Sequence, residues 1–257
     1  QPTPEPEPEP SNPPVGPGPL EPSPTPGAGA GIGPALDTSK YQQLLWVSTS
    51  GSDSAAGTEA NPLRTFAKAI SLATPGTGIV VKGGSYSERI RIENKHGRAD
   101  AWFTLMAAPG ERATIKGGSG ETRALLDVRS AYWRIVGMTF DAGGDRAFGA
   151  IWRGAGKHGE LLKSELMNGS LGAGVTVAEG GSDVLIEGNH IHHFRQGTND
   201  SHGVLTQTNS ARVVIRGNDI HGNSGDAVQC LGSEGGAAAA GTPFDDLLVE
   251  NNLLHDN

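Results

Sequence analysis

The clearest pattern along the chain is an alternation of apolar and polar residues that returns at nearly regular intervals. Residues 184–192, 213–221 and 247–255 each carry three aliphatic residues, a charged residue, a Gly-Asn or Asn-Asn pair and, one residue later, an apolar residue followed by histidine. Weaker copies lie at residues 135–141 and 162–168. Such self-similarity predicts a solenoid, in which each coil repeats the strands of the coil before it.

One aliphatic position is shared by all of these copies, and its spacing measures the coil. The intervals are 27, 24, 29 and 34 residues between Ile135, Leu162, Ile186, Ile215 and Val249. The period stays nearly constant while the insertions vary, which is typical of coils that keep their strands and vary their loops. Alternation points this position inward, toward a narrow core in which each coil covers the next.

A second short strand precedes each of the last three copies, at residues 175–177, 204–206 and 228–230. Cys230 shares an inward position with the corresponding residues of the earlier coils, so we expect a small buried side chain and not a nucleophile. It is the single cysteine of the chain, which excludes an intrachain disulfide.

Polar residues also recur at fixed places in the coils. We expect the asparagines after each corner to stack as a buried ladder whose amides bond between coils; these are Asn189, Asn218 and Asn252. The histidines that end each copy are interpreted as corner residues and not as ligands; these are His192, His221 and His255. His190 is expected to face solvent. The adjacent His192 and His193 are expected to project to opposite sides of a strand, which makes a poor metal site.

The first folded segment carries different elements. Residues 44–47 predict a short strand that runs into a turn-rich loop. Between Asn61-Pro62 and Pro75-Gly76, apolar residues at helical spacing predict one short amphipathic helix; these are Leu63, Phe66, Ala67, Ile70 and Ala73. Residues 79–81 and 90–92 then predict two strands around a tight corner.

Composition divides the chain into two parts. Thirteen of the 17 prolines lie in the first 34 residues, a composition that favours extended polyproline II and cannot bury apolar surface. We therefore expect residues 1–40 to form a disordered Pro-rich linker or stalk, and residues 41–257 to form the solenoid domain. Because Asn257 falls inside a repeat, we expect that domain to be truncated at its carboxyl end.

Charge and hydropathy narrow the classes of partner. The net charge is −8, and four unpartnered glutamates of the tail carry half of it. The rest of the chain lacks the basic stripe that nucleic-acid binding requires. No apolar run approaches the roughly 18 residues of a membrane-spanning helix. An acidic stalk before a cysteine-poor domain is typical of a secreted or cell-surface bacterial protein. The alternative is a cytoplasmic protein with a disordered tail.

One segment near the start of the folded part resembles a known family. Its motifs are Gly51-Ser52-Asp53, Gly57-Thr58, Pro62, Thr65, Ala69, Pro75-Gly76 and Gly84-Ser85-Tyr86 with Glu88. They resemble the amino-terminal cap and first coil of bacterial right-handed parallel β-helix proteins of the pectate-lyase-like superfamily. The resemblance implies an all-β, right-handed parallel β-helix with a short amphipathic amino-terminal capping helix. The same opening precedes lyases, epimerases and proteins without known activity, so it indicates fold and not catalysis.

The resemblance also implies a class of partner. β-Helices of this superfamily commonly hold extended polysaccharides on their outward strand faces and the loops beside them. Lyases among them neutralise a uronate carboxylate, usually with Ca²⁺ or basic side chains, and withdraw the adjacent proton with Lys, Arg, His or Tyr. The implied partner is therefore a polysaccharide. The implied cofactor is Ca²⁺, for which Asp245-Asp246 is a candidate position without an identified ligand set.

Candidate site residues gather between positions 190 and 229. If Val204 and Val228 stack, His202 and Asp226 occupy equivalent positions one rung, about 5 Å, apart, where a carboxylate can orient a general base. The candidate catalytic residues are His202, Asp226 and Arg195. The candidate substrate-binding residues are Asp200, Gln207, Gln229 and Arg216. The alternative for the two aspartates is that they cap turns, since each precedes a strand within a polar cluster.

The catalytic patterns of the superfamily leave more than one function open. The paired strand aspartates of its polygalacturonase-like hydrolases are missing here. Family-nine-type lyases add a Lys that this region lacks beyond Lys163, so Arg195 or Arg216 would have to replace it. The leading hypothesis is recognition of an extracellular acidic polysaccharide with cleavage by β-elimination. The alternatives are a non-catalytic glycan-binding or adhesive surface β-helix and, more remotely, a tailspike fragment that would need trimer contacts. The oligomeric state is left open.

Overall fold

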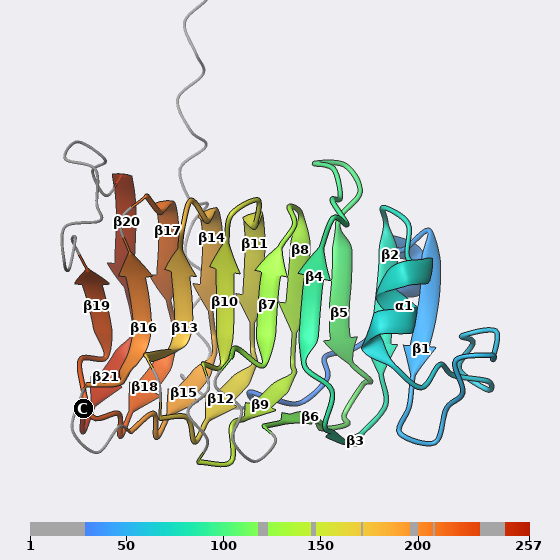
Figure 1. Ribbon diagram of the computed structural model, residues 1–257, viewed down its shortest axis with the longest axis horizontal. Helices are drawn as coiled ribbons and strands as arrows, with labels where there is room; N and C mark the ends of the chain where they lie inside the picture. The colour runs from blue at the N-terminus through green and yellow to red at the C-terminus, as the bar shows by residue number, and fades with distance from the viewer. Residues whose placement is uncertain are drawn as a thin grey trace, which may run out of the picture.

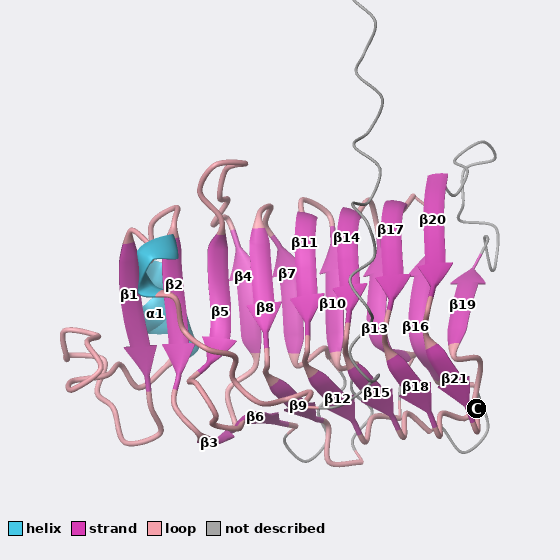
Figure 2. Ribbon diagram, turned by 180° about the vertical axis from the view of Figure 1, so that it is seen from behind, coloured by secondary structure: helices cyan, strands magenta, loops and turns pink. Residues whose placement is uncertain are grey.

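Three parallel sheets run side by side along the molecule and enclose one narrow core. The computed structural model describes residues 29–117, 123–144, 148–170, 172–195, 200–207, 209–231 and 245–257. Figure 1 looks onto the six-stranded sheet, and Figure 2 shows the eight-stranded sheet from behind, with the seven-stranded sheet below both. The predicted parallel solenoid is confirmed.

Each sheet takes one strand from each successive coil. The eight-stranded sheet contains β1 (Gln43–Val47), β2 (Thr77–Val81), β5 (Phe103–Ala107), β8 (Trp133–Val136), β11 (Lys157–Leu162), β14 (Ser182–Glu187), β17 (Ala211–Arg216) and β20 (Asp245–Glu250). The six-stranded sheet contains β4 (Ile90–Glu93), β7 (Leu126–Arg129), β10 (Ala150–Arg153), β13 (Ala173–Ala178), β16 (His202–Gln207) and β19 (Val228–Leu231). The seven-stranded sheet contains β3 (Gly84–Tyr86), β6 (Ala113–Lys116), β9 (Thr139–Asp141), β12 (Glu165–Met167), β15 (His190–His192), β18 (Asp219–His221) and β21 (Leu253–His255).

The corner between the eight-stranded and the seven-stranded sheets contains the predicted asparagine ladder. Asn189 Nδ2 donates to Asn218 Oδ1, and Asn218 Nδ2 donates to Asn252 Oδ1, both at 2.9 Å. Gly188 and Gly217 precede two of these asparagines with φ of 65° and 62°, which a side chain would strain. The ladder satisfies buried corner amides and holds neighbouring coils in one register.

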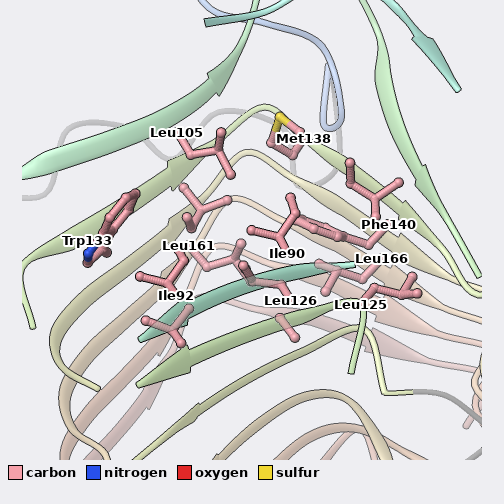
Figure 3. Close-up of a cluster of buried hydrophobic side chains, with 14 of the residues drawn as sticks. Ile90, Ile92, Leu105, Leu125, Leu126, Trp133, Met138, Phe140, Leu161 and Leu166 are labelled. Carbon is pink, nitrogen blue, oxygen red and sulfur yellow. The ribbon is translucent and has the colours of Figure 1, made fainter. Parts of the chain in front are cut away.

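The core consists of the inward residues of all three sheets. Ten of them are labelled in Figure 3: Ile90, Ile92, Leu105, Leu125, Leu126, Trp133, Met138, Phe140, Leu161 and Leu166. The rings of Phe103 and Trp133 stack at a centroid distance of 4.6 Å. Because each coil covers the next, aliphatic side chains fill most of this interior and few aromatic rings are needed.

The amino-terminal helix α1 (Phe66–Leu72) packs against the first coil and buries Phe66, Ala69 and Ile70. Thr65 caps the helix by accepting from Lys68 N at 3.1 Å. Glu88 accepts from Phe66 N and Ala67 N, both at 2.8 Å, so its carboxylate supplies partners for the unpaired amides of the first turn. The predicted capping helix is confirmed, although Leu63 and Ala73 lie outside its ends.

The structure describes the last part of the segment that the sequence predicts to be a stalk. Residues 1–28 of the predicted stalk lie outside the described residues. Residues 29–40 are attached to the coils, because Gly31 N donates to Lys163 O and Gly33 N donates to Glu111 O, both at 2.9 Å. None of the helices in the described ranges is long and apolar enough to cross a membrane.

Two positional predictions are corrected by the register. Ile135 and Ile186 both pair with Leu161, so the inward residue of that coil is Leu161 and not Leu162. Two adjacent leucines cannot be told apart by an apolar pattern alone. Cys230 pairs with Thr206 as expected, but it is exposed, because it lies on β19, the edge strand of the six-stranded sheet.

Candidate functional site

The predicted pair of His202 and Asp226 lies at the entrance of β16 and β19. Val204 pairs with Val228, which confirms the register on which the pair was predicted. The imidazole Nδ1 of His202 accepts from Asp226 N at 3.0 Å and lies 3.9 Å from the Asp226 carboxylate. The side chain of His202 is only 7% exposed, whereas that of Asp226 is 66% exposed. In the neutral ring, the proton therefore sits on Nε2.

Two further predicted residues join this pair. Gln229 Nε2 donates to the Asp226 carboxylate at 3.4 Å. Asp200 is close to His202 across Gly225: a Cβ atom on that glycine would lie 2.6 Å from His202 Nδ1 and 2.7 Å from Asp200 Cβ. Gly225 is thus required for the close approach of these side chains. The structure brings His202, Asp226, Asp200 and Gln229 together.

The other three predicted residues lie elsewhere. Arg195 follows β15, and its Nε donates to Gly222 O of the next coil at 2.7 Å. Gln207 is at the opposite end of β16 from His202. Arg216 belongs to the eight-stranded sheet, where it pairs with Glu187 at 3.2 Å and Glu250 at 3.9 Å. Arg216 and Gln207 therefore do not share one surface patch with His202.

A different charged group occupies the outer face of the six-stranded sheet. Arg91, Arg129 and Arg153 lie on the consecutive strands β4, β7 and β10, and we call them the arginine row. Asp127 lies between them with its side chain 4% exposed. It accepts from Arg153 Nε and Nη2 at 3.1 and 2.9 Å and from Arg129 Nε at 3.2 Å. One buried acid thus orients two guanidinium groups.

The charges of the arginine row are balanced. Burial raises the pKa of Asp127, but hydrogen bonds from Arg153 and Arg129 outweigh it and hold that pKa below its usual value. Arg91 pairs with Glu93 at 2.8 Å, and Arg153 lies 3.5 Å from Glu179. The side chains of Arg91, Arg129 and Arg153 remain 53%, 31% and 26% exposed. Arg129 also lies 3.9 Å from Glu93, so each guanidinium is paired with an acid but keeps part of its surface open to a ligand.

The sequence prediction missed the arginine row for a definable reason. The coils that contain residues 126–129 and 150–153 lack the Gly-Asn corner that made the later coils easy to align, since they carry Gly137-Met138 and Lys163-Ser164 at that place. The alternation of Leu126, Asp127, Val128 and Arg129 was nevertheless a usable signal, because it places the two charged residues on the outward face.

A third group lies on the outer face of the seven-stranded sheet. Its imidazoles come from strands β15, β18 and β21 and the residue after β15, and we call them the histidine cluster: His190, His192, His193, His221 and His255. The Nε2 atoms of His190 and His221 lie 2.8 Å apart. The rings of His192 and His221 stack at 5.3 Å, and those of His221 and His255 stack at 4.6 Å.

Two predictions about these histidines are corrected. His192 Nδ1 and His193 Nδ1 lie 2.6 Å apart, so the two side chains meet and do not project to opposite sides. β15 ends at His192, and His193 adopts a φ of 59°, which turns its side chain back. His190 is not freely solvated either, since its side chain is only 25% exposed. The alternation rule failed because the strand had already ended.

Acidic side chains border the histidine cluster. Glu165 Oε1 lies 3.5 Å from His192 Nε2 and 3.7 Å from His190 Nδ1, and the carboxylate also pairs with Arg112. Burial raises the pKa of Glu165, but the neighbouring His190 and His192 imidazoles and the Arg112 guanidinium lower it far more, well below the usual range. Burial and neighbouring cationic groups lower the pKa of His193 and, despite the opposing effect of Asp219, that of His221. The neutral imidazole is therefore favoured at His193 and His221, whereas the carboxylates of Asp256 and Asp219 raise the pKa of the partly exposed His255.

The expected cofactor Ca²⁺ can be compared with the donors present. Among the described residues, two groups of three ligand-type side chains converge: His190, His192 and His221, and Asp219, His221 and His255. Ca²⁺ binds oxygen ligands and requires six to eight of them, whereas these groups offer mainly imidazole nitrogen. The described residues therefore do not fit Ca²⁺ at these groups. The side chain of Asp245 lies outside the described residues.

The fold and these surfaces define a parallel β-helix with polar ligand-type groups on its outer faces. Residues 45–238 match the family described as Pel9A-like, right handed beta helix region. The match covers most of the chain, so the chain belongs to this family, and the right-handed β-helix of the pectate-lyase-like superfamily is confirmed.

Similar proteins include several with lyase names. The chain is 40% identical to pectate lyase PEL9 of Emericella nidulans over 74 residues, which are 28% of this chain and 18% of that protein. The structure of pectate lyase Pel9A aligns with a TM-score of 0.63 and 17% identity, covering 80% of this chain and 58% of that one. A rhamnogalacturonan lyase aligns with a TM-score of 0.51 and 17% identity, covering 84% and 69%. The aligned parts thus span less than two thirds of PEL9 and of Pel9A.

Proposed function

We propose that this chain binds an acidic, uronate-bearing polysaccharide along the outer face of the six-stranded sheet. The observation that carries the proposal is the arginine row, which places a cation on each of three consecutive strands about 4.8 Å apart. Arg153 aligns with Arg129, whereas Arg91 is paired in the strand register with Asp127, two residues before Arg129. A polyuronate carries a carboxylate on each sugar of an extended chain. Its line of carboxylates can therefore lie along the arginine row. The names of the similar lyases support the same class of ligand.

Asp127 makes the row suitable for carboxylate binding. It engages Nε of Arg129 and the Nε and Nη2 edge of Arg153, so it fixes both planes and leaves further N–H donors for a ligand. A guanidinium that is already oriented loses less side-chain entropy when it forms a bidentate pair with a carboxylate. The buried acid therefore acts as a support and need not touch the glycan.

We further propose cleavage by β-elimination, in keeping with the lyase names of the relatives. A base removes the C5 proton of the uronate, the C4–C5 double bond forms, and the C4–O bond breaks with protonation of the leaving oxygen. This step also needs a cation beside the carboxylate, and the arginine row does not supply one next to His202, because Arg153 aligns with the Gln207 end of β16. His202 is the candidate base and Asp226 its neighbour, with Asp200 and Gln229 beside them, whereas the candidate Arg195 lies after β15 and donates to Gly222 O.

The position of His202 sets a condition on this cleavage. His202 Nδ1 accepts from Asp226 N, so Nε2 carries the ring proton and cannot accept another. Cleavage through Nε2 requires that this hydrogen bond break and the proton move to Nδ1. The same observation favours the second candidate function, glycan binding without cleavage. In that case His202 only accepts the hydrogen bond from Asp226 N and so holds the next coil in place.

Two assays test these proposals separately. Binding is measured with polygalacturonate, alginate and a glycosaminoglycan, with a neutral glucan as control. We expect the polyuronates to bind and their affinity to fall with added salt, and equal affinity for the neutral glucan would contradict the proposal. Cleavage is followed by the ultraviolet absorbance of 4,5-unsaturated products, with Ca²⁺ or with a chelator. Binding without any absorbance change would leave the non-catalytic function.

We also propose a secreted or cell-surface location, because a polysaccharide of this kind is encountered outside the cell. Detection of the native chain in the culture medium or on intact cells of its source would support this, and its restriction to the cytosolic fraction would contradict it.

A further inference from the structure

Three imidazoles of the histidine cluster meet on two neighbouring rungs. His190 and His192 are alternate residues of β15, and His221 lies on β18, opposite His192. Each offers one ring nitrogen, and the three nitrogens lie within 4.8 Å of one another. The strand register fixes these positions, so the group is assembled by the fold before any ligand arrives.

One of these side chains is buried with one ring nitrogen unpaired. His192 is 8% exposed, and its Nε2 makes no hydrogen bond among the described residues. The carboxylate of Glu165 is 3.5 Å away but not in hydrogen-bonding geometry. Buried polar atoms are nearly always paired, so this nitrogen indicates a ligand. The pair of Nε2 atoms of His190 and His221, 2.8 Å apart, likewise offers two converging nitrogens.

We propose that His190, His192 and His221 bind one divalent transition-metal ion of the Zn²⁺ class. Imidazole nitrogen favours Zn²⁺, Co²⁺, Ni²⁺ or Cu²⁺ over Ca²⁺ and Mg²⁺. Glu165 lies 3.7 Å from His190 Nδ1, where a carboxylate can orient a ligating ring through its other nitrogen. This site is on another sheet from the arginine row, so it is independent of the polysaccharide proposal.

The ion would connect adjacent coils. Two ligands belong to β15 and one to β18, so bound metal links two rungs that are otherwise held by backbone and asparagine hydrogen bonds. An ion that binds only the folded state stabilises it by mass action. We therefore expect Zn²⁺ to raise the melting temperature of the chain by a few degrees and Ca²⁺ to leave it unchanged.

The first experiment measures binding on the full, untagged chain after removal of metal with a chelator. Calorimetric titration with Zn²⁺ should give one ion per chain, and Co²⁺ should give visible absorption bands typical of nitrogen ligation. Ca²⁺ and Mg²⁺ serve as control ions and should not compete. Absence of Zn²⁺ binding, or full competition by Ca²⁺, would overturn the proposal.

Substitution of the proposed ligands tests where the ion binds. His190→Ala and His221→Ala should each weaken Zn²⁺ binding by at least about 10-fold, and Glu165→Gln by about 10-fold. His158→Ala is the matched control, because His158 stacks on Tyr132 away from the cluster and should leave the affinity unchanged. Melting curves recorded in chelator establish that each variant folds.

Two further variants test whether the ion binds at the neighbouring group of Asp219, His221 and His255 and not at the proposed site. Asp219→Asn and His255→Ala remove members of the group that shares only His221 with the proposed site. Both should keep most of the Zn²⁺ affinity. If they abolish binding while His190→Ala does not, the ion lies on the other group and the proposed ligand set is wrong.

Discussion

The outer faces of the six-stranded and seven-stranded sheets use the same strand alternation for different chemistry. On the six-stranded sheet, one buried acid, Asp127, lies among arginines that stay charged at every physiological pH. On the seven-stranded sheet, one half-buried acid, Glu165, lies among histidines that can be neutral. The first face offers fixed cations for an anionic ligand, whereas the second offers lone pairs for a cation.

The difference shows that in this β-helix the inward residues determine the fold and the outward residues determine the surface chemistry. Inward residues are apolar on nearly every rung, with buried exceptions such as Thr206, so the two faces share the same support and register. Outward residues are free to vary, and vertical neighbours on successive strands lie close enough to act together. A functional group on this fold is therefore a column of outward residues, and it can change without disturbing the core.

The largest expected effect comes from the corner that holds the histidine face in register. Asn218 is fully buried, and its Nδ2 donates to Ile186 O and Asn252 Oδ1 while its Oδ1 accepts from Asn189. Asn218→Ala should lower the free energy of unfolding by about 3 kcal/mol, because it leaves buried amides unpaired. Urea denaturation measures the loss.

We expect Asn218→Ala to affect ligand binding on the two faces differently. Zn²⁺ affinity should fall in Asn218→Ala, whereas polygalacturonate affinity should stay near that of the parent chain, because repeat coils couple mainly to their neighbours. Asn61→Ala is the control at an exposed position and should cost far less stability. Equal losses from the two variants would contradict the role given to the ladder.

The next effect tests the support of the arginine face. Asp127→Asn keeps the shape but removes the charge that two guanidinium groups share. We expect a loss of about 2 kcal/mol in the free energy of unfolding, less than for a fully buried ion pair because both arginines are partly exposed. Asp100→Asn removes an exposed partner of Arg98 and should cost under about 1 kcal/mol. Similar denaturation midpoints for the two variants would show that burial of Asp127 does not matter.

A smaller effect concerns ligand affinity. Arg91→Gln and Arg153→Gln should each weaken polygalacturonate binding about 10-fold, or about 1.4 kcal/mol, and Arg153→Lys should recover part of the loss. Arg216→Gln is the matched control, since Arg216 is as exposed as Arg153 and is likewise paired with acids, but on the eight-stranded sheet. If Arg216→Gln weakens binding as much, attraction to net charge and not the row explains the affinity.

The smallest effect is the acid dependence of the histidine face. Because the folded-state pKa of Glu165 lies below its unfolded value of about 4.3, its contribution to stability is full above that pH and is lost as the pH falls further. The stability difference between the parent chain and Glu165→Gln should therefore shrink between about pH 4.3 and the onset of acid unfolding. A difference that stays constant over that range would contradict the depressed pKa.

The solenoid could be predicted from the sequence because its period, its asparagine corners and its inward residues all obey local rules. The same rules placed Val204 beside Val228. They failed at His193, whose positive φ follows the end of a strand that the pattern could not locate. They also missed Asp127 and Arg153, because the earlier coils lack the corner motif and two residues 26 positions apart meet only through the register. Chemistry on this fold depends on vertical neighbours, which a single sequence reveals only after the coils are aligned.

The central claim, that the arginine row binds the polysaccharide, is tested most directly by mass-spectrometric footprinting. The full chain is treated with an arginine-specific dicarbonyl reagent, with and without saturating oligogalacturonate. We expect the ligand to protect Arg91, Arg129 and Arg153 and to leave Arg112 and Arg216 as reactive as before. Protection of Arg216, or no protection of the row at saturating ligand, would contradict it.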